Sequence, residues 1–242
     1  MNRTNRLVLY SPFTPKSIIS YGLIVFSKNT GRWLLVRRKH SVEFLTFIKG
    51  FYRLTYLPIL LSLLTHEETL MIRDLINEKS FNDLYFSTLK LDSNNYRYAL
   101  DRFLESKDII MSIINIVHSD NSLQWNWPRG RVSDNRENPF LCACREFVEE
   151  VEVPLPQPMY ISKNYYSEII NTVTGRCIES RYWIYVIENE IYLNPVENHD
   201  EVSHRAWFTT EQCNNLLYFP NLLTTAISVI TKYILNSKCT QL

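Results

Sequence analysis

Three glutamates, Glu146, Glu149 and Glu150, stand close together at spacings of three and one residues. Residues three and four apart share one face of an α-helix, so the three carboxylates are expected to project together from one helix. Like charges on one face repel each other, and a hard divalent cation such as Mg²⁺ or Mn²⁺, which prefers oxygen ligands, would stabilise them. A solvated acidic helix face is the alternative, and the spacing alone does not decide between the two.

The helix that would carry these glutamates has a distinct start signal. Asn138 is a good N-cap residue, and Pro139 suits the first helical position. The helix is predicted to run to about Val151, with apolar residues such as Phe147 available for packing.

A longer pattern around this helix favours metal binding. Gly130, Glu137 and the run Arg145-Glu146-Phe147-Val148-Glu149-Glu150 stand in the order of the Nudix box, and from Glu137 onward they match its spacing. The segment from Gly130 to Val153 therefore resembles the Nudix hydrolases, which cleave phosphoanhydride bonds. The segment departs from the box at two places. The loop between Gly130 and Glu137 holds one extra residue, and Glu152 replaces a final glycine that would adopt a turn conformation more easily.

The resemblance implies a role for each box residue. Glu146, Glu149 and Glu150 would bind the metal, helped by a backbone carbonyl of Arg129 or Gly130. The metal would polarise a phosphate, offset its charge and activate a water for attack at phosphorus.

The resemblance also implies an orienting ion pair and a general base. Arg145 and Glu137 would form the pair that orients the helix, with an ordinary surface salt bridge as the alternative. The base would be Glu149 or a carboxylate on a later loop, where Glu201 precedes Trp207. An ordinary exposed acid remains the alternative for Glu201, and Glu197 is a weaker candidate.

The flanking segments indicate an α/β domain interrupted by a helical block. Strands are expected over residues 20–26, 32–37 and 180–187, and a helix over 221–235. Between them, helices are expected over 42–56, 95–106 and 107–117, and another opens with a capping box at Thr65 to Glu68. The predicted fold is an α/β Nudix fold, an α/β/α sandwich with a mixed sheet. Residues 1–41 and 119–242 would form it, and residues 42–118 would be a helical insertion domain.

The composition places limits on the class of protein. Hydrophobic residues make up 45% of the chain, which indicates a folded protein, and 26 basic residues balance 25 acidic ones, which argues against a globally basic nucleic-acid binder. Five cysteines without a CxxC pair indicate free thiols in a reducing compartment. We expect no secretory signal, and the most apolar stretch, residues 52–64, is too short to span a bilayer. We expect a soluble, intracellular protein with no membrane partner.

The start of the helical block narrows the resemblance. The segments 37–44 and 125–130 look like the corresponding parts of mRNA-decapping Nudix enzymes of large DNA viruses, of the pox-, asfar- and mimivirus type. This resemblance implies hydrolysis of the cap triphosphate bridge, with release of 7-methyl-GDP and 5′-monophosphate RNA. The partner would be capped mRNA, bound in part by the helical insertion, and the location would be the cytoplasm, that of the host cell for a viral protein.

Basic and aromatic residues suit such a substrate. RNA needs cations for its backbone and aromatic faces for its bases. Scattered solvated charges are the alternative for the basic residues, and core packing is the alternative for the aromatic ones. The candidate RNA-binding residues are Arg37, Arg38, Lys39, Lys49 and Arg53, and the candidate stacking residues are Trp125, Trp127, Tyr165 and Tyr166.

Two other functions are compatible with the box. One is a Nudix hydrolase of small substrates, such as dinucleoside polyphosphates, nucleotide sugars or diphosphoinositol phosphates. The other is a Nudix-fold binding module without catalysis, which the intact glutamate trio argues against. The sequence leaves a homodimer open.

Overall fold

Two separate units make up the computed structural model of this chain. One unit is formed by Met1–Lys39 together with Gln124–Leu242, and the other is His40–Leu123. The structure describes residues 18–75, 77–89, 95–117, 121–171, 177–197, 199–217 and 220–239. Each unit is considered by itself.

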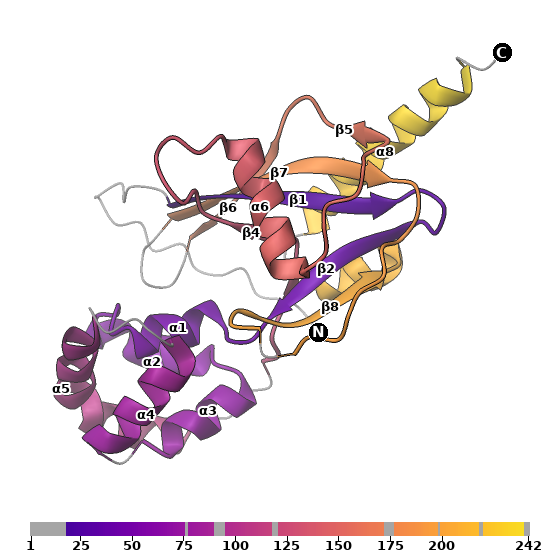
Figure 1. Cartoon of the computed structure of the whole chain (residues 1–242). Helices are drawn as coiled ribbons and strands as arrows, with labels where there is room; N and C mark the ends of the chain where they lie inside the picture. Colours follow the sequence, from indigo (N-terminus) through magenta and orange to yellow (C-terminus); the bar gives the residue numbers. More distant parts are fainter. Residues whose placement is uncertain are drawn as a thin grey trace. The chain divides into compact units, whose positions relative to one another are not determined.

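A mixed sheet forms the centre of the first unit (Figure 1). Its central strands β1 (Ile18–Ser27) and β7 (Cys177–Ile187) run parallel, and all its other strand pairs are antiparallel. The expected strands over 20–26, 32–37 and 180–187 are confirmed. The other strands are β2 (Arg32–Arg38), β3 (Trp125–Asn126), β4 (Arg129–Gly130), β5 (Tyr160–Ile161), β6 (Tyr166–Asn171) and β8 (Val202–Phe208).

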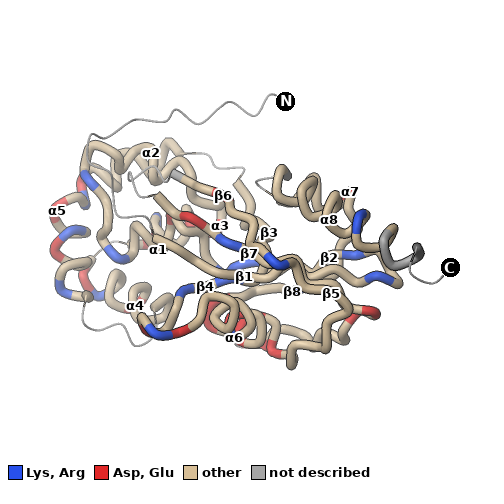
Figure 2. Tube along the Cα trace, turned by 90° about the horizontal axis from the view of Figure 1, so that it is seen from above, with Lys and Arg blue, Asp and Glu red and all other residues tan. Residues whose placement is uncertain are grey.

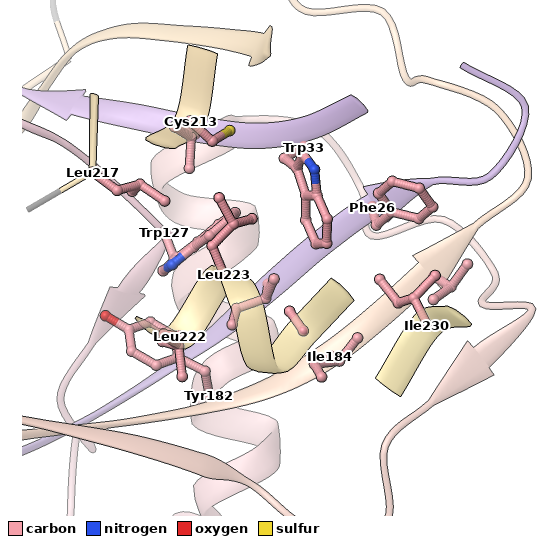
Figure 3. Packing of buried hydrophobic residues seen from close by; sticks show 14 residues of the cluster. Phe26, Trp33, Trp127, Tyr182, Ile184, Cys213, Leu217, Leu222, Leu223 and Ile230 are labelled. Carbon is pink, nitrogen blue, oxygen red and sulfur yellow. The ribbon is translucent and has the colours of Figure 1, made fainter. Parts of the chain in front are cut away.

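Helices cover both faces of this sheet because successive strand residues point to opposite sides. Leu23 and Val25 of β1 lie in the core beneath α6 (Pro139–Val151). Ile24 of β1 lies in the other core, with side chains of α7 (Thr210–Leu216) and α8 (Pro220–Cys239). Figure 3 shows Cys213, Leu223 and Trp127 of this core. The predicted fold class, an α/β/α sandwich with a mixed sheet, is confirmed. No helix among the residues described is both long and apolar enough to cross a membrane.

The second unit is entirely helical in its described residues. Two predictions about its helices are wrong. The first helix ends at Ile48 and not near residue 56, and Gly50, shortly after it, has a φ of 70°. Residues 96–114 form one helix without a break at Ser106. Ser106 lies inside this helix, and its hydroxyl donates to the carbonyl of Arg102 (2.7 Å), a bond that a serine can form without interrupting a helix. The helices are α1 (Val42–Ile48), η1 (Leu54–Tyr56), α2 (Leu57–Ser62), α3 (His66–Arg73), α4 (Glu78–Leu89) and α5 (Tyr96–Ile114).

The capping box at the start of α3 is present as predicted, with Thr65 and Glu68 each accepting the other's backbone N–H. Glu68 also accepts hydrogen bonds from the backbone N–H (2.6 Å) and hydroxyl (2.7 Å) of Ser41, the N-cap residue of α1. A single carboxylate therefore connects the first turns of two helices. Helix α4 was not predicted.

Leu223→Ala tests the packing of α8 on the sheet. Leu223 is fully buried, so the substitution leaves a cavity and should lower the free energy of unfolding by about 3 kcal/mol. The matched control is Leu235→Ala in the same helix, where the side chain is 59% exposed and the loss should stay below about 0.5 kcal/mol. Equal losses in urea unfolding would contradict this packing.

Candidate active site

Helix α6 is held both at its start and along its buried face. The side-chain oxygen of Asn138 accepts hydrogen bonds from the backbone N–H groups of Phe140 (2.9 Å) and Leu141 (3.3 Å), and Pro139 follows the cap. Phe147 is fully buried in the core under the helix. The start signal and the predicted end near Val151 are both confirmed.

The carboxylates lie in the C-terminal half of α6, visible as acidic positions in Figure 2. The C-terminal end of a helix carries a partial negative charge, so acidic side chains are unfavourable there. Mutual repulsion adds to this cost. The arrangement therefore needs positive charge from somewhere else.

Glu150 is the most deeply buried of these carboxylates. It is only 5% exposed, and one of its oxygens accepts a hydrogen bond from the backbone N–H of Arg129 (3.0 Å). Burial raises the pKa of Glu150 to about 7, and the nearby Glu201 and Glu146 charges add to the increase, while Arg38 opposes it. This carboxylate is thus buried and is not a solvated surface acid, and its role as a metal ligand stays a prediction.

Glu146 lies directly against Gly130. A Cβ atom at position 130 would come within 2.0 Å of the Glu146 carboxyl group, so any other residue there would force this carboxyl group to move. Burial raises the pKa of Glu146 as well. The box glycine and the first glutamate of the trio are therefore in contact despite the extra residue in the loop between Gly130 and Glu137.

Arg145 connects the loop to the helix. Its guanidinium donates to both carboxylate oxygens of Glu137, at 2.8 and 3.0 Å, so the ion pair between these residues is present. Another guanidinium nitrogen donates to Glu146 and Glu149, each at 2.8 Å. The Arg145 hydrogen bonds, together with one from the backbone of Ser133, lower the pKa of Glu137 to about 2. Arg145 thus both braces the loop and partly neutralises the trio.

An open pocket of about 430 Å³ lies beside the C-terminal half of α6. It brings Glu201, from the loop before β8, together with all three box glutamates. Asp200 and His199 of the same loop also line it, although no pattern in the sequence distinguished them. The lining residues are Glu146, Glu149, Glu150, Glu152, His199, Asp200 and Glu201.

The donor set of this pocket fits a hard divalent cation. Its walls are carboxylates, one of them buried with its pKa raised to about 7, and oxygen ligands are what Mg²⁺ and Mn²⁺ prefer. Among the residues described, no three acidic, histidine or cysteine side chains already stand as ligands of one ion. Arg145 holds Glu146 and Glu149 in this structure. The metal-binding role of the Arg129 or Gly130 carbonyl stays a prediction.

The structure explains how Glu152 can replace the final glycine of the Nudix box. Glu152 ends α6 with a φ of 54°, in the left-handed region that glycine adopts more easily. The buried guanidinium of Arg205 on β8 donates to the Glu152 carboxylate and to the backbone carbonyl of Val151. These bonds offset the backbone strain, and they attach the end of α6 to β8. Arg205 was missed because no local pattern links it to the box.

The candidate RNA-binding residues have different surroundings. Arg37 donates to the Ser203 hydroxyl (3.3 Å), and its guanidinium lies 5.7 Å from the centre of the Trp125 ring. Arg38, the next residue, instead acts electrostatically on Glu150. The backbone N–H of Lys39 donates to the carbonyl of Glu201 (2.7 Å). Adjacent arginines therefore do not share one surface.

The remaining candidates fall in other parts of the chain. Lys49 and Arg53 belong to the helical unit, and their role in binding RNA stays a prediction. Trp127 is 3% exposed and packs in the core, so it is not available for stacking a base. Tyr165 is 44% exposed.

Glu150→Gln should stabilise the metal-free protein, and more so at pH 8 than at pH 5. The fold raises the Glu150 pKa to about 7, so stability is lost as pH rises from the ordinary carboxyl range through about 7, where this buried group must ionise. The glutamine avoids that cost, which is on the order of 3 kcal/mol above pH 7. Thermal unfolding in EDTA at both pH values measures the difference. Glu149→Gln, at a side chain that is 56% exposed, is the control, and an equal gain for Glu150→Gln at pH 5 and pH 8 would contradict the burial argument.

Arg205→Met should lower the free energy of unfolding by about 2 kcal/mol, because the Val151 carbonyl loses its partner and Glu152 loses its ion pair. Glu152→Gly should change it by less than about 1 kcal/mol, since glycine relieves the positive φ as the ion pair is lost. Chemical denaturation measures both. The explanation fails if Glu152→Gly costs as much as Arg205→Met.

Comparison with known proteins supports the resemblance to decapping enzymes. The chain is 22% identical over 220 residues to a candidate mRNA-decapping protein of Acanthamoeba polyphaga mimivirus, covering 77% of this chain and 61% of that protein. It is 27% identical over 146 residues to mRNA-decapping protein g5R of African swine fever virus, covering 55% of this chain and 59% of that protein. The chain thus spans about three fifths of the length of each relative. No protein-family model matches the chain.

Solved structures show only a distant likeness. An Ap4A hydrolase of C. elegans in a binary complex has a TM-score of 0.46 at 12% identity, covering 90% of this chain and 98% of that one. A NUDIX hydrolase from Nitrosomonas europaea has a TM-score of 0.41 at 10% identity, covering 88% and 87%. At these low TM-scores the assignment rests on the sequence relatives and on the residues of the box. The predicted resemblance to the viral mRNA-decapping proteins, made from the Nudix box and the start of the helical block, is confirmed.

Proposed function

We propose that this chain is a metal-dependent Nudix hydrolase that cleaves the triphosphate bridge of capped mRNA. The products would be 7-methyl-GDP and 5′-monophosphate RNA. The observation that carries the proposal is the pocket beside α6, where the box glutamates and Glu201 meet. The similarity to viral mRNA-decapping proteins supports the choice of substrate.

The roles of the carboxylates follow from their positions. Glu146, Glu149 and Glu150 would hold Mg²⁺ or Mn²⁺, which when bound polarises the phosphate and lowers the pKa of water. The Glu149 side chain is 56% exposed and that of Glu146 only 14%, and Glu201 lines the same pocket. One of these two carboxylates would take the proton from the attacking water. The ion pair of Arg145 and Glu137 would hold the loop in a fixed position against the helix.

Among the candidate RNA-binding residues, Arg38 would act nearest the scissile phosphates, because its charge influences the buried Glu150. The other candidate basic residues and the helical unit would bind the phosphates of the RNA body, which is the RNA downstream of the cap. Capped mRNA implies a cytoplasmic site of action. A homodimer is neither required nor opposed by these contacts.

A Nudix hydrolase of small phosphoanhydrides is the second candidate. Every residue that lines the pocket belongs to the first unit, so the helical unit supplies none of the acidic groups. A small substrate would then need no contact with the helices. Competition distinguishes the two candidates. Long uncapped RNA should inhibit a decapping enzyme, whereas it should not slow hydrolysis of a small dinucleotide by an enzyme of the second kind.

Product analysis on cap-labelled RNA tests the reaction. With Mg²⁺ or Mn²⁺ the wild type should release labelled 7-methyl-GDP, and Glu149→Gln and Glu150→Gln should each lower kcat by at least about a hundredfold, since each removes charge from the metal site. Glu201→Gln should lower kcat as well. The matched control is Glu197→Gln, an exposed acid of the same loop that does not line the pocket, which should retain the wild-type rate.

Three results would count against the proposal. Near-normal rates for both Glu149→Gln and Glu150→Gln would contradict the assignment of these residues as metal ligands. Equal use of free cap dinucleotide and capped RNA would favour the small-substrate enzyme. No turnover of any phosphoanhydride across a Mn²⁺ titration would indicate a binding module.

A further inference from the structure

His199 connects the loop that carries Glu201 to the catalytic helix. Its Nδ1 atom accepts hydrogen bonds from the backbone N–H groups of Glu201 (3.0 Å) and Val202 (2.9 Å). Its Nε2 atom lies 2.9 Å from the backbone carbonyl oxygen of Glu149 on α6. One imidazole ring therefore contacts the loop on one side and the helix on the other.

The contacts define the tautomer of this ring. Nδ1 faces two N–H donors and must offer its lone pair, so it carries no proton. Nε2 faces a carbonyl oxygen and must donate, so it carries the proton. In this tautomer both nitrogens are used by the backbone. Neither is free to bind a metal or to transfer a proton while these bonds persist.

Three further hydrogen bonds hold Glu201 and the start of β8 to residues at the end of β2. The carbonyl of Glu201 accepts from the backbone N–H of Lys39 (2.7 Å). The hydroxyl of Ser203 donates to the carbonyls of Arg37 (3.2 Å) and Arg38 (3.0 Å), where the β2–β8 register shifts. A register shift of this kind re-aims neighbouring side chains, and such shifts are frequent next to active sites. The loop is thus attached to β2, and His199 supplies its attachment to α6.

We propose that His199 is a positioning residue, which holds the Glu201 carboxylate in the pocket at a set distance from the carboxylates of α6. This inference rests on the proposed function for its effect on the reaction. Catalysis requires reacting groups to be held closely, and small displacements reduce rates strongly. Loss of the ring should therefore lower kcat without weakening the contacts that bind the RNA body.

Kinetics on capped RNA provide the first test. His199→Ala should lower kcat by about ten- to a hundredfold and leave KM within about twofold. His199→Asn retains an acceptor near the position of Nδ1 but cannot reach the Glu149 carbonyl, so its kcat should lie between those of His199→Ala and the wild type. Added to Glu201→Gln, the His199→Ala substitution should cause little further loss, because it acts through Glu201. A wild-type kcat for His199→Ala, or full additivity in the double variant, would overturn the proposal.

Amide hydrogen exchange provides a readout that does not depend on activity. The amides of Glu201 and Val202 should exchange at least about tenfold faster in His199→Ala than in the wild type, and His199→Asn should restore most of the protection. Unchanged exchange in His199→Ala would overturn the positioning role even if kcat fell. A wild type that leaves capped RNA intact while showing the predicted exchange would instead refute the proposed function and leave the positioning of the loop established.

Discussion

The crowding of negative charge at the C-terminal half of α6 is the constraint on which the rest of this site depends. The box glutamates lie where the helix dipole disfavours them, and Glu150 is buried besides. Burying a carboxylate without a compensating cation is costly, and the raised pKa of Glu150 expresses that cost. Such an arrangement lowers the stability of the fold unless a cation binds. Binding of a divalent ion would relieve the repulsion between the carboxylates, and this relief would contribute to the affinity for the ion.

The surroundings of α6 hold this charged helix in place. Gly130 leaves room for the Glu146 carboxyl group, and Arg145 binds carboxylates of both the loop and the helix. At the other end, Arg205 binds the last turn of the helix and connects it to β8. The strand β8 follows directly on Glu201. The geometry of the pocket is thus determined jointly by the helix, the loop before β8 and the edge of the sheet.

Sequence patterns predicted this site where the relevant contacts are local. The cap at Asn138, the spacing of the glutamates and the pair of Arg145 with Glu137 lie within one segment, and periodicity or motif spacing is enough to find them. Arg205 and His199 contact α6 from about fifty residues further along the chain, so no local pattern could indicate them. The break predicted at Ser106 is wrong for another reason: a serine is compatible with a helix interior when its hydroxyl bonds to the preceding turn, as that of Ser106 does. The sequence also could not predict that the adjacent arginines have different surroundings. Arg37 lies beside the Trp125 ring, whereas the charge of Arg38 acts on Glu150.

The central claim is that the carboxylates of this pocket bind a divalent cation, and calorimetric titration of the metal-free protein with Mn²⁺ tests it most directly. We expect saturable binding by the wild type, with protons released at pH 6 as the ion displaces them from Glu150. Binding should weaken at least about tenfold in a Glu149→Gln, Glu150→Gln double variant that retains its fold. Mn²⁺ binding of equal strength in the wild type and the double variant, or no binding by the wild type, would contradict the account.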